Sequence, residues 1–298
     1  MRFSFAEAMC DPDHYVPLAL AAERGGFTSF TIPDSICYPE VSDSTYPYTP
    51  DGNREFLDGR PFIDPFVLTA TLGAVTETLR LTTFVVKLPI RQPVLVAKQA
   101  AEVDVLSGGR LRLGIGVGWN TVEYEALGED FHNLGARSAE QIEVMRALWT
   151  QDVVDFHGKW HNISHAGLNP LPVQRPIPIW LGAGSSQSPM PPDSVLKRVA
   201  RLADGWCPNF SPDETGRAAV EKTHGFMREL GRDPDALGLD GRLRTGGRKP
   251  EEWVDEAKAW QELGAGYLSI ENRQAGLKTA GDHIEAMRRV KEATGLRF

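Results

Sequence analysis

Two glycine-rich stretches of this sequence follow apolar segments and could bind a flat or phosphorylated ligand. The first contains Gly114, Gly116 and Gly118, which remove side chains from the end of a predicted strand and open its backbone to close approach. The second, Gly182–Ser186, reads GAGSS and offers free amides and two hydroxyl groups, which suit an anion near the start of a helix. Each pattern alone also fits a tight turn. Because α/β proteins bind ligands at the carboxyl ends of parallel strands, we expect the two stretches to form one site.

The side chains that could serve as nucleophile, acid, base or metal ligand form no familiar arrangement. His157, His161 and His165 are spaced by four residues and would share one face of a helix. Gly158 and the alternating flanks instead favour a hairpin, so we interpret these histidines as surface residues and predict no metal site. Ser185 lies outside any nucleophile-elbow motif, and no base can be assigned to it. Such a sequence is typical of a protein whose bound cofactor supplies the chemistry.

The composition limits the class of protein and of partner. The 298 residues have a net charge of −8, which argues against nucleic acid or an anionic membrane as the main partner. The three cysteines show no C-x-x-C spacing, and their odd number argues against a disulfide framework. The first residues, MRFSFAEAM, do not resemble a secretory signal, and no apolar run approaches the roughly 20 residues of a membrane span. We therefore expect a cytoplasmic protein.

Short apolar strands alternate with amphipathic helices along the whole sequence. The predicted strands are Arg2–Glu7, Phe27–Ile32, Leu79–Leu88, Arg110–Ile115, Ile177–Leu181, Gly205–Pro208, Leu237–Thr245 and Tyr267–Ile270. Helices are predicted between them; for example, Ser138 with Gln141 forms a capping-box signature that indicates a helix start. Eight strand–helix units without a linker predict an α/β fold, a closed (β/α)8 TIM barrel that forms a single domain over residues 1–298. A pair of doubly wound domains is the alternative.

Two segments interrupt this rhythm and are predicted to be insertions in the barrel. Pro33–Pro61 is rich in Pro, Asp, Gly and Tyr, and loops of this length in compact domains are usually functional or disordered. Val153–Gln174 contains a predicted hairpin that turns at Gly158, followed by a proline-rich stretch. In the first insertion, Tyr46 and Tyr48 could shape a substrate pocket or attach the loop to the barrel rim.

Several of these segments together resemble the bacterial luciferase-like superfamily of flavin- and deazaflavin-dependent oxidoreductases. The likeness covers nearly the whole chain and is strongest in Leu79–Leu127, which contains the run LSGGRLRLGIGVGW. It recurs in Ile177–Pro208, with IPIWLGAGS followed by VLKRVARLADGWCP, and in IPDSICYPE and YPYTPDG of the first insertion. The actinobacterial branch that uses coenzyme F420 is the most similar. The resemblance implies a TIM barrel with an insertion after the fourth helix.

The resemblance also implies where the cofactor binds. In relatives the ring leans on a bulge in the third strand that often contains a non-prolyl cis peptide bond. Here that bulge falls within Phe84–Lys87, and we assign it to Val85 and Val86. The phosphate site and the nearby backbone of the fourth strand then correspond to Gly184, Ser185 and Ser186, with Gly116, Val117 and Gly118 beside them.

Three departures from the family pattern bear on substrate and cofactor. Sugar-phosphate dehydrogenases of the superfamily have a glutamate where this chain has Trp119, and a histidine where Ser35 follows Asp34. Sugar-phosphate substrates are therefore not expected. Bacterial luciferase has an arginine at the position of Val117, so its phosphate clamp is incomplete here, which favours F420 over FMN. An apolar wall at Trp119 predicts a mostly apolar, neutral substrate; the pocket residues we expect are Ser35, Tyr46, Tyr48 and Trp119.

Three functions follow from the resemblance. The first is an F420-dependent oxidoreductase that transfers a hydride between the deazaflavin and a small, mostly apolar organic substrate. The second is an FMN-dependent two-component monooxygenase, supplied with reduced flavin by a separate reductase. Deazaflavin lacks the N5 nitrogen and does not readily form an oxygen adduct, so the cofactor largely decides the reaction. The third is a flavin-binding protein without turnover. Relatives are usually dimers, so we expect a homodimer.

Overall fold

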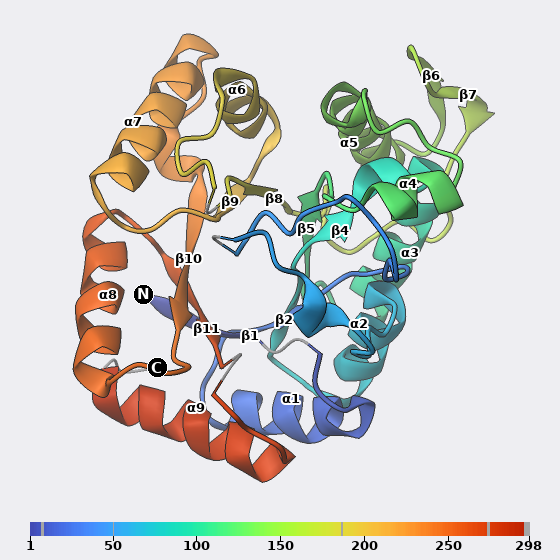
Figure 1. Ribbon diagram of the computed structural model, residues 1–298. Helices are drawn as coiled ribbons and strands as arrows, with labels where there is room; N and C mark the ends of the chain where they lie inside the picture. The colour runs from blue at the N-terminus through green and yellow to red at the C-terminus, as the bar shows by residue number, and fades with distance from the viewer. Residues whose placement is uncertain (7–8, 50, 186, 273–274, 295–298) are drawn as a thin grey trace.

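The chain folds into a closed parallel barrel surrounded by helices (Figure 1). The computed structural model describes residues 1–6, 9–49, 51–185, 187–272 and 275–294. The barrel strands in chain order are β1 (Arg2–Ala6), β2 (Ser29–Ile32), β3 (Arg80–Thr83), β4 (Val86–Lys87), β5 (Leu111–Gly116), β8 (Ile179–Ala183), β9 (Gly205–Pro208), β10 (Gly238–Arg244) and β11 (Tyr267–Glu271). Each strand pairs in parallel with the next position around the ring, and β11 pairs with β1, which closes the barrel. The predicted TIM barrel is confirmed.

Helices follow the strand positions and cover the outside of the barrel. They are α1 (Tyr15–Arg24), α2 (Pro65–Val75), α3 (Pro93–Leu106), α5 (Leu134–Thr150), α6 (Asp193–Leu202), α7 (Glu214–Glu229), α8 (Pro250–Glu262) and α9 (Ala280–Thr294). Local signals start several of them: Asp64 accepts hydrogen bonds from the amides of Phe66 and Val67 at the start of α2, where proline occupies the first turn. In the described part of the chain, every helix is too short or too polar to cross a lipid bilayer.

The third strand is broken, whereas the sequence predicts a continuous strand over Leu79–Leu88. β3 ends at Thr83, and a non-prolyl cis peptide bond joins Phe84 to Val85 before β4 begins. Both pieces pair with β5: Leu81 lies opposite Leu111, and farther along Val86 lies opposite Ile115. The strand pattern alone did not predict this break, because both pieces are apolar. The break does lie within Phe84–Lys87, where the resemblance implies a bulge, but it falls at Phe84 and Val85 rather than at the assigned Val85 and Val86.

The helix after β5 also differs from the prediction. α5 begins at Leu134 rather than at Ser138, and Ser138 is buried inside the helix. The amide of Arg137 already donates to the carbonyl of Asn133, so the helical pattern starts one turn earlier. Gln141 does not complete a cap but donates to the carbonyl of Arg91 at 2.9 Å. A further short helix, α4 (Thr121–Ala126), precedes α5 and was not predicted.

Both predicted insertions lie where the sequence places them. The first, Pro33–Pro61, contains a single turn of 3-10 helix, η2 (Glu55–Leu57), in its described residues and crosses the face of the barrel in Figure 1. The second contains the expected hairpin, formed by β6 (Val154–His157) and β7 (Asn162–Ala166). Three further 3-10 turns complete the described elements: η1 (Pro12–His14), η3 (Leu88–Ile90) and η4 (Pro234–Ala236).

Candidate cofactor and substrate site

A cavity of about 250 Å³, which we call the central cavity, opens at the carboxyl ends of the barrel strands. Of the predicted site residues, those that line it are Ser35, Tyr46, Tyr48, Val85, Gly116, Val117, Gly118, Trp119 and Gly184. The fold thus brings together the two glycine-rich stretches and both tyrosines of the insertion. Val86 is fully buried in β4 and is not among the lining residues, and neither is Ser185. Ser186 lies outside the described residues.

The glycines of β5 make room for the broken third strand. A Cβ atom on Gly114 would lie 1.8 Å from the carbonyl oxygen of Thr83, and one on Gly116 would lie 2.5 Å from Cγ2 of Val85. Gly182 in β8 faces the same valine, with 3.1 Å between its Cβ position and Cγ1. The sequence suggested that these glycines expose backbone to a ligand. In the structure, the side chain of Val85 occupies the space that these glycines leave open. A ligand in the cavity would contact this side chain.

The loop after β8 has the conformation expected of a small-residue turn. Gly184 has φ of +95°, which L side chains rarely adopt, and its Cβ position lies 3.4 Å from the amide nitrogen of Asn209. The hydroxyl of Ser185 accepts a hydrogen bond from the amide of Ser188 at 3.0 Å, so it closes the loop on itself. Gly184 and Ser185 are the two residues of the predicted phosphate site in this loop that the structure describes. Gly184 lines the cavity, and Ser185 does not.

Arg198 in α6 is a site residue that the sequence analysis missed. Its side chain is half-buried, lines the central cavity, and has no hydrogen-bond or ion-pair partner in the described part of the chain. Burial lowers the pKa of this guanidinium because its charge is partly removed from water without a compensating anion. The neighbouring Lys197 instead projects over the ring of Phe226 at 5.0 Å. A cation without a counter-ion beside Gly184 is suited to a phosphate group.

A buried ionic network lies at the ends of β2 and β4. Lys87 lines the cavity and its Nζ donates to Oε2 of Glu123 at 2.6 Å, with both side chains almost fully buried. The amide of Lys87 donates to Asp34, which also accepts two 2.8 Å hydrogen bonds from Arg91. These pairs fix the end of β2, and with it Ser35, against the end of β4. Their charges are already compensated, so they position the wall rather than exchange protons.

Aromatic side chains form the lid of the cavity. The ring of Tyr46 meets the edge of Trp119 at 5.3 Å between centroids and 89° between planes. Tyr48 and Phe56 pack on Tyr46 at 5.1 Å each. Burial, with a smaller effect of Tyr46, raises the pKa of Tyr48 to about 12, so its phenol stays protonated at neutral pH. The insertion thus contacts Trp119 through Tyr46, and this contact gives the cavity an apolar surface on this side.

Two charged residues at the ends of β10 and β11 complete the lining and were not predicted. The guanidinium of Arg242 stacks over the ring of Phe84, 4.2 Å from its centroid, and lies 3.5 Å from Oε2 of Glu271. Glu271 is buried at the end of β11, and Arg244 approaches it at 3.7 Å from outside. Strand alternation would have indicated that Arg242 and Arg244 share a face, but no local signal places a carboxylate between them.

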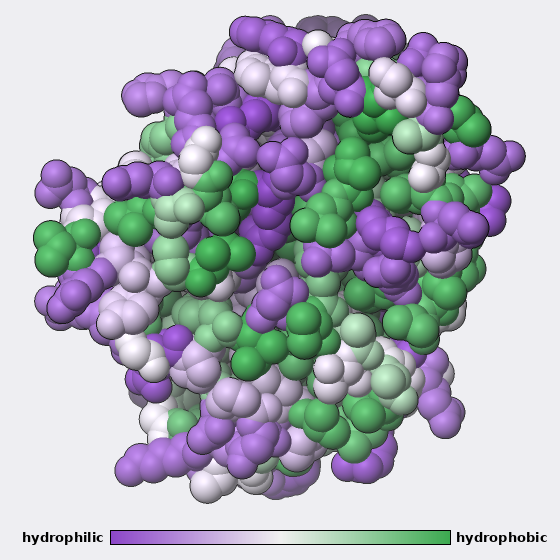
Figure 2. Space-filling view, turned by 90° about the vertical axis from the view of Figure 1, so that its right-hand side faces the viewer, coloured by the Kyte–Doolittle hydropathy of each residue, from purple (hydrophilic) through white to green (hydrophobic). Residues whose placement is uncertain are grey.

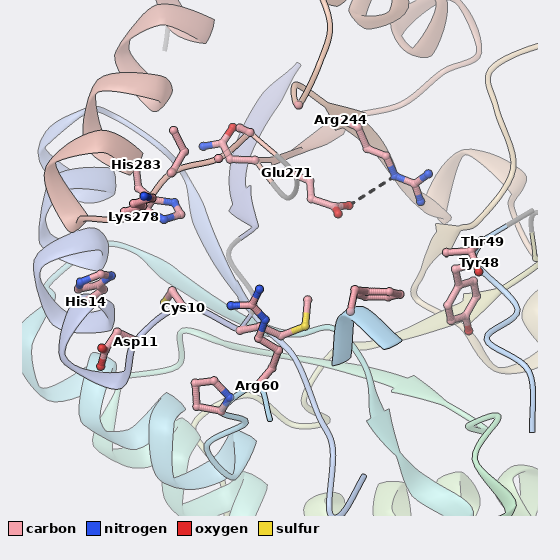
Figure 3. Close-up of a pocket in the computed structure, with 18 of the residues that line it drawn as sticks. Cys10, Asp11, His14, Tyr48, Thr49, Arg60, Arg244, Glu271, Lys278 and His283 are labelled. Atoms are coloured by element: carbon pink, nitrogen blue, oxygen red, sulfur yellow. Dashed lines mark ion pairs between the residues drawn. The ribbon is translucent and has the colours of Figure 1, made fainter. Parts of the chain in front are cut away.

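A larger cavity of about 750 Å³, which we call the outer cavity, adjoins the first (Figure 3). The two share Met9, Tyr46, Tyr48 and Glu271 in their linings. In the described residues, no group of three or more His, Cys, Asp or Glu side chains is arranged to hold a metal ion. The geometry can therefore bind a flat, phosphorylated group on Val85 and admit a second molecule from the outer cavity.

Comparison with known proteins identifies the family. The model of the luciferase-like monooxygenase family matches residues 6–297. The chain belongs to this family. An uncharacterized protein of Mycobacterium tuberculosis is 48% identical over 257 residues, which cover 85% of this chain and 86% of that protein. The FMNH2-dependent dimethylsulfone monooxygenase of Pseudomonas putida is 35% identical over 214 residues, 71% of this chain and 52% of that enzyme.

Solved structures confirm the luciferase-like fold. An F420-dependent secondary alcohol dehydrogenase, determined with an F420–acetone adduct, superposes with a TM-score of 0.80 at 17% identity over 98% of both chains. Luciferase-like family members are oxidoreductases or monooxygenases, and both F420-dependent and FMN-dependent enzymes occur among the similar proteins. The resemblance read from the sequence is confirmed at the level of family, fold and enzyme class.

Proposed function

We propose that this luciferase-like protein is an F420-dependent oxidoreductase that transfers a hydride between the deazaflavin and a small organic substrate. The observation that carries the proposal is the central cavity. Val85 forms an apolar support admitted by glycines on β5 and β8, and Arg198 lines the same cavity without a counter-ion among the described residues. A planar ring with a phosphorylated side chain has the chemistry that this arrangement complements.

The residues present fit such a cofactor. A guanidinium that is half-buried and unpartnered is costly in the free protein and becomes favourable once an anion reaches it. When bound, the deazaflavin supplies the hydride donor or acceptor carbon. Around it, Val85 would support the ring, Arg198 and the Gly184 backbone would hold the phosphate, and Trp119 with Tyr46 would exclude water. Arg242 adds positive charge to the wall, which favours a cofactor that carries negative charge.

Two observations bear on the choice between F420 and FMN. Val117 lines the cavity without a charge where the luciferase pattern has an arginine, which supports F420. The Pseudomonas putida relative is named as FMNH2-dependent, which supports the alternative, a monooxygenase that takes reduced FMN from a separate reductase.

Equilibrium titration with F420 and with FMN in the same buffer and salt tests the assignment. We expect F420 to bind at least tenfold more tightly, a difference of about 1.4 kcal/mol. Equal or reversed affinities would assign the chain to the FMN-dependent monooxygenases. Failure of both cofactors to bind would refute the proposal as a whole.

We further propose a homodimer, supported by the outer surface of α2 and α3. Figure 2 views the side of the molecule on which Figure 1 shows these helices, and apolar side chains are spread over it. Four exposed apolar side chains lie on α3: Val94, Leu95, Val105 and Leu106, the last 71% exposed. Leu95 and Leu106 are eleven residues apart, which places them on the same face of the helix. Covering this face with a second copy would remove it from water.

A further inference from the structure

The outer cavity has a positively charged lining, although the chain as a whole has a net charge of −8. Its cationic side chains are Arg60, Arg244, Arg248 and Lys278, and its carboxylates are Asp11 and Glu271. Glu256 compensates the charge of Arg248, so the described part of the lining has three cations against two carboxylates, an excess opposite in sign to the charge of the molecule. An excess of one sign in a recess concentrates ligands of the other sign.

Among the described residues, Arg60 and Lys278 have no ion-pair partner, and Arg244 shares the carboxylate of Glu271 with Arg242. Arg248 is held by an ion pair with Glu256, which is not among the lining residues. Arg60 has no side-chain hydrogen bond or ion pair in the described residues, and the same is true of the ammonium group of Lys278. Figure 3 shows the Arg60 side chain in the middle of the cavity, with Glu271 and Arg244 on one side and Cys10 and His14 on the other.

The carboxylate of Glu271 does not compensate both guanidinium groups that lie near it. It faces Arg242 at 3.5 Å and Arg244 at 3.7 Å, so one negative charge is set against two positive ones. This group stands on the boundary of the two cavities, since Glu271 lines both. The positive charge therefore continues up to the place where a substrate would pass toward the cofactor.

We propose that the outer cavity binds the anionic group of an organic substrate, a carboxylate or sulfonate, through Arg60 and Arg244. This proposal rests on the proposed function and names the substrate class of that site. The apolar part of the same molecule lies against Tyr46 and Tyr48, which line both cavities, and reaches Trp119 in the central one. The substrate is thus a small organic anion with an apolar body, rather than the neutral molecule predicted from Trp119.

The positive charge of the outer cavity could instead bind the acidic side chain of the cofactor. The anionic group of a substrate and that of the cofactor would lie at different positions. A phosphate held at Gly184 and Arg198 lies beside β8 and α6, whereas Arg60 and Arg244 come from the first insertion and from β10. The substrate is therefore the source that the geometry favours, and the experiment separates the two.

Hexanoate is the probe and hexan-1-ol its uncharged counterpart, each titrated calorimetrically into the protein with and without saturating F420 or FMN. We expect hexanoate to bind on the order of tenfold more tightly than hexan-1-ol. Arg60→Gln and Arg244→Gln should each remove most of that difference and leave cofactor affinity unchanged. Arg217→Gln is the matched control, because Arg217 is exposed on α7 and lines neither cavity. Arg60 makes no side-chain contact that the fold needs, and thermal melting verifies folding of each variant.

Any other result distinguishes failure of the substrate proposal from failure of the proposed function. If the two substitutions weaken F420 or FMN binding but not hexanoate binding, the anion is that of the cofactor and the substrate proposal is wrong. If the cofactor binds normally but hexanoate binds no better than hexan-1-ol, the substrate proposal is wrong and the proposed function stands. If hexanoate binding depends on Arg60 while neither cofactor binds, the anion site is supported and the proposed function is refuted.

Discussion

Replacing Arg198 by methionine should have opposite effects on cofactor affinity and on the stability of the free protein. Methionine keeps an unbranched apolar chain about as long as the aliphatic stem of arginine but lacks the guanidinium. The charge has no partner in the described residues, and burial already lowers its pKa, so in the free protein it is desolvated without compensation. A bound phosphate supplies the missing anion. The same group therefore destabilises the free fold and stabilises the complex.

The size of each effect follows from the surroundings of the guanidinium with and without bound phosphate. Loss of a hydrogen bond to a charged group costs about 1.5–3 kcal/mol, so the Kd of F420 or FMN should rise roughly 10-fold to 150-fold in Arg198→Met. The free energy of unfolding of the cofactor-free protein should rise by about 0.5–2 kcal/mol, the usual gain when a functional site loses an unfavourable group. The apparent stabilisation by added cofactor should fall accordingly.

The assay combines equilibrium titration with urea unfolding. Riboflavin, which lacks the phosphate, should bind wild type and Arg198→Met with the same affinity if the guanidinium contacts the phosphate. Lys197→Met is the matched control, because Lys197 lies next in the chain but over Phe226 on the outer side. Unchanged affinity for phosphorylated cofactors in a folded Arg198→Met would refute the reasoning. An equal loss for riboflavin and FMN would show that Arg198 supports the ring or the fold instead.

Three further results are expected. Trp119→Ala should change the Kd of the cofactor by less than about threefold, or about 0.7 kcal/mol. It should increase iodide quenching of bound-cofactor fluorescence, because the aromatic cover over the cavity loses the indole. Loss of folding would contradict the role assigned to Trp119. Gly116→Ala should destabilise the protein by about 1–3 kcal/mol in urea unfolding, because the new methyl would lie 2.5 Å from Val85, and adding Val85→Ala should recover most of this. Additive effects of the two changes would disprove the contact. Leu95→Asp combined with Leu106→Asp should shift the protein from dimer to monomer in sedimentation experiments, and an unchanged mass would move the interface elsewhere.

Much of the architecture could be predicted because its signals are local. Strand and helix patterns alternate along the chain, and glycine shows directly where a backbone must come close to something else. The closed barrel, the hairpin of the second insertion and the meeting of Gly116 with Gly184 at one cavity all follow from such patterns. The error at Ser138 arose in the same way: a capping pattern is local, and it does not exclude a helix that starts one turn earlier.

The partner of each glycine could not be predicted, because it comes from a distant segment. Gly114 and Gly116 belong to β5, but the atoms that require them belong to Thr83 and Val85 at the break in the third strand. The sequence by itself determined that backbones approach closely there. Only the tertiary structure decided that a valine, rather than the ligand itself, fills the space.

The positions of charged side chains show most clearly the difference between what the sequence determines and what the tertiary structure decides. Lys197 and Arg198 are adjacent and alike in the sequence, yet the packing of α6 on the barrel turns one outward and the other into the central cavity. Arg60 and Arg244 are 184 positions apart by their numbers, and no pattern within either segment indicates that they line one recess. The sequence determined the strands, the helices and the backbone positions open to close approach, because these depend on neighbours in the chain. The tertiary structure alone decided where the charges meet, because electrostatic interaction depends on distance in space and on burial, and both are set by how the units close into a barrel.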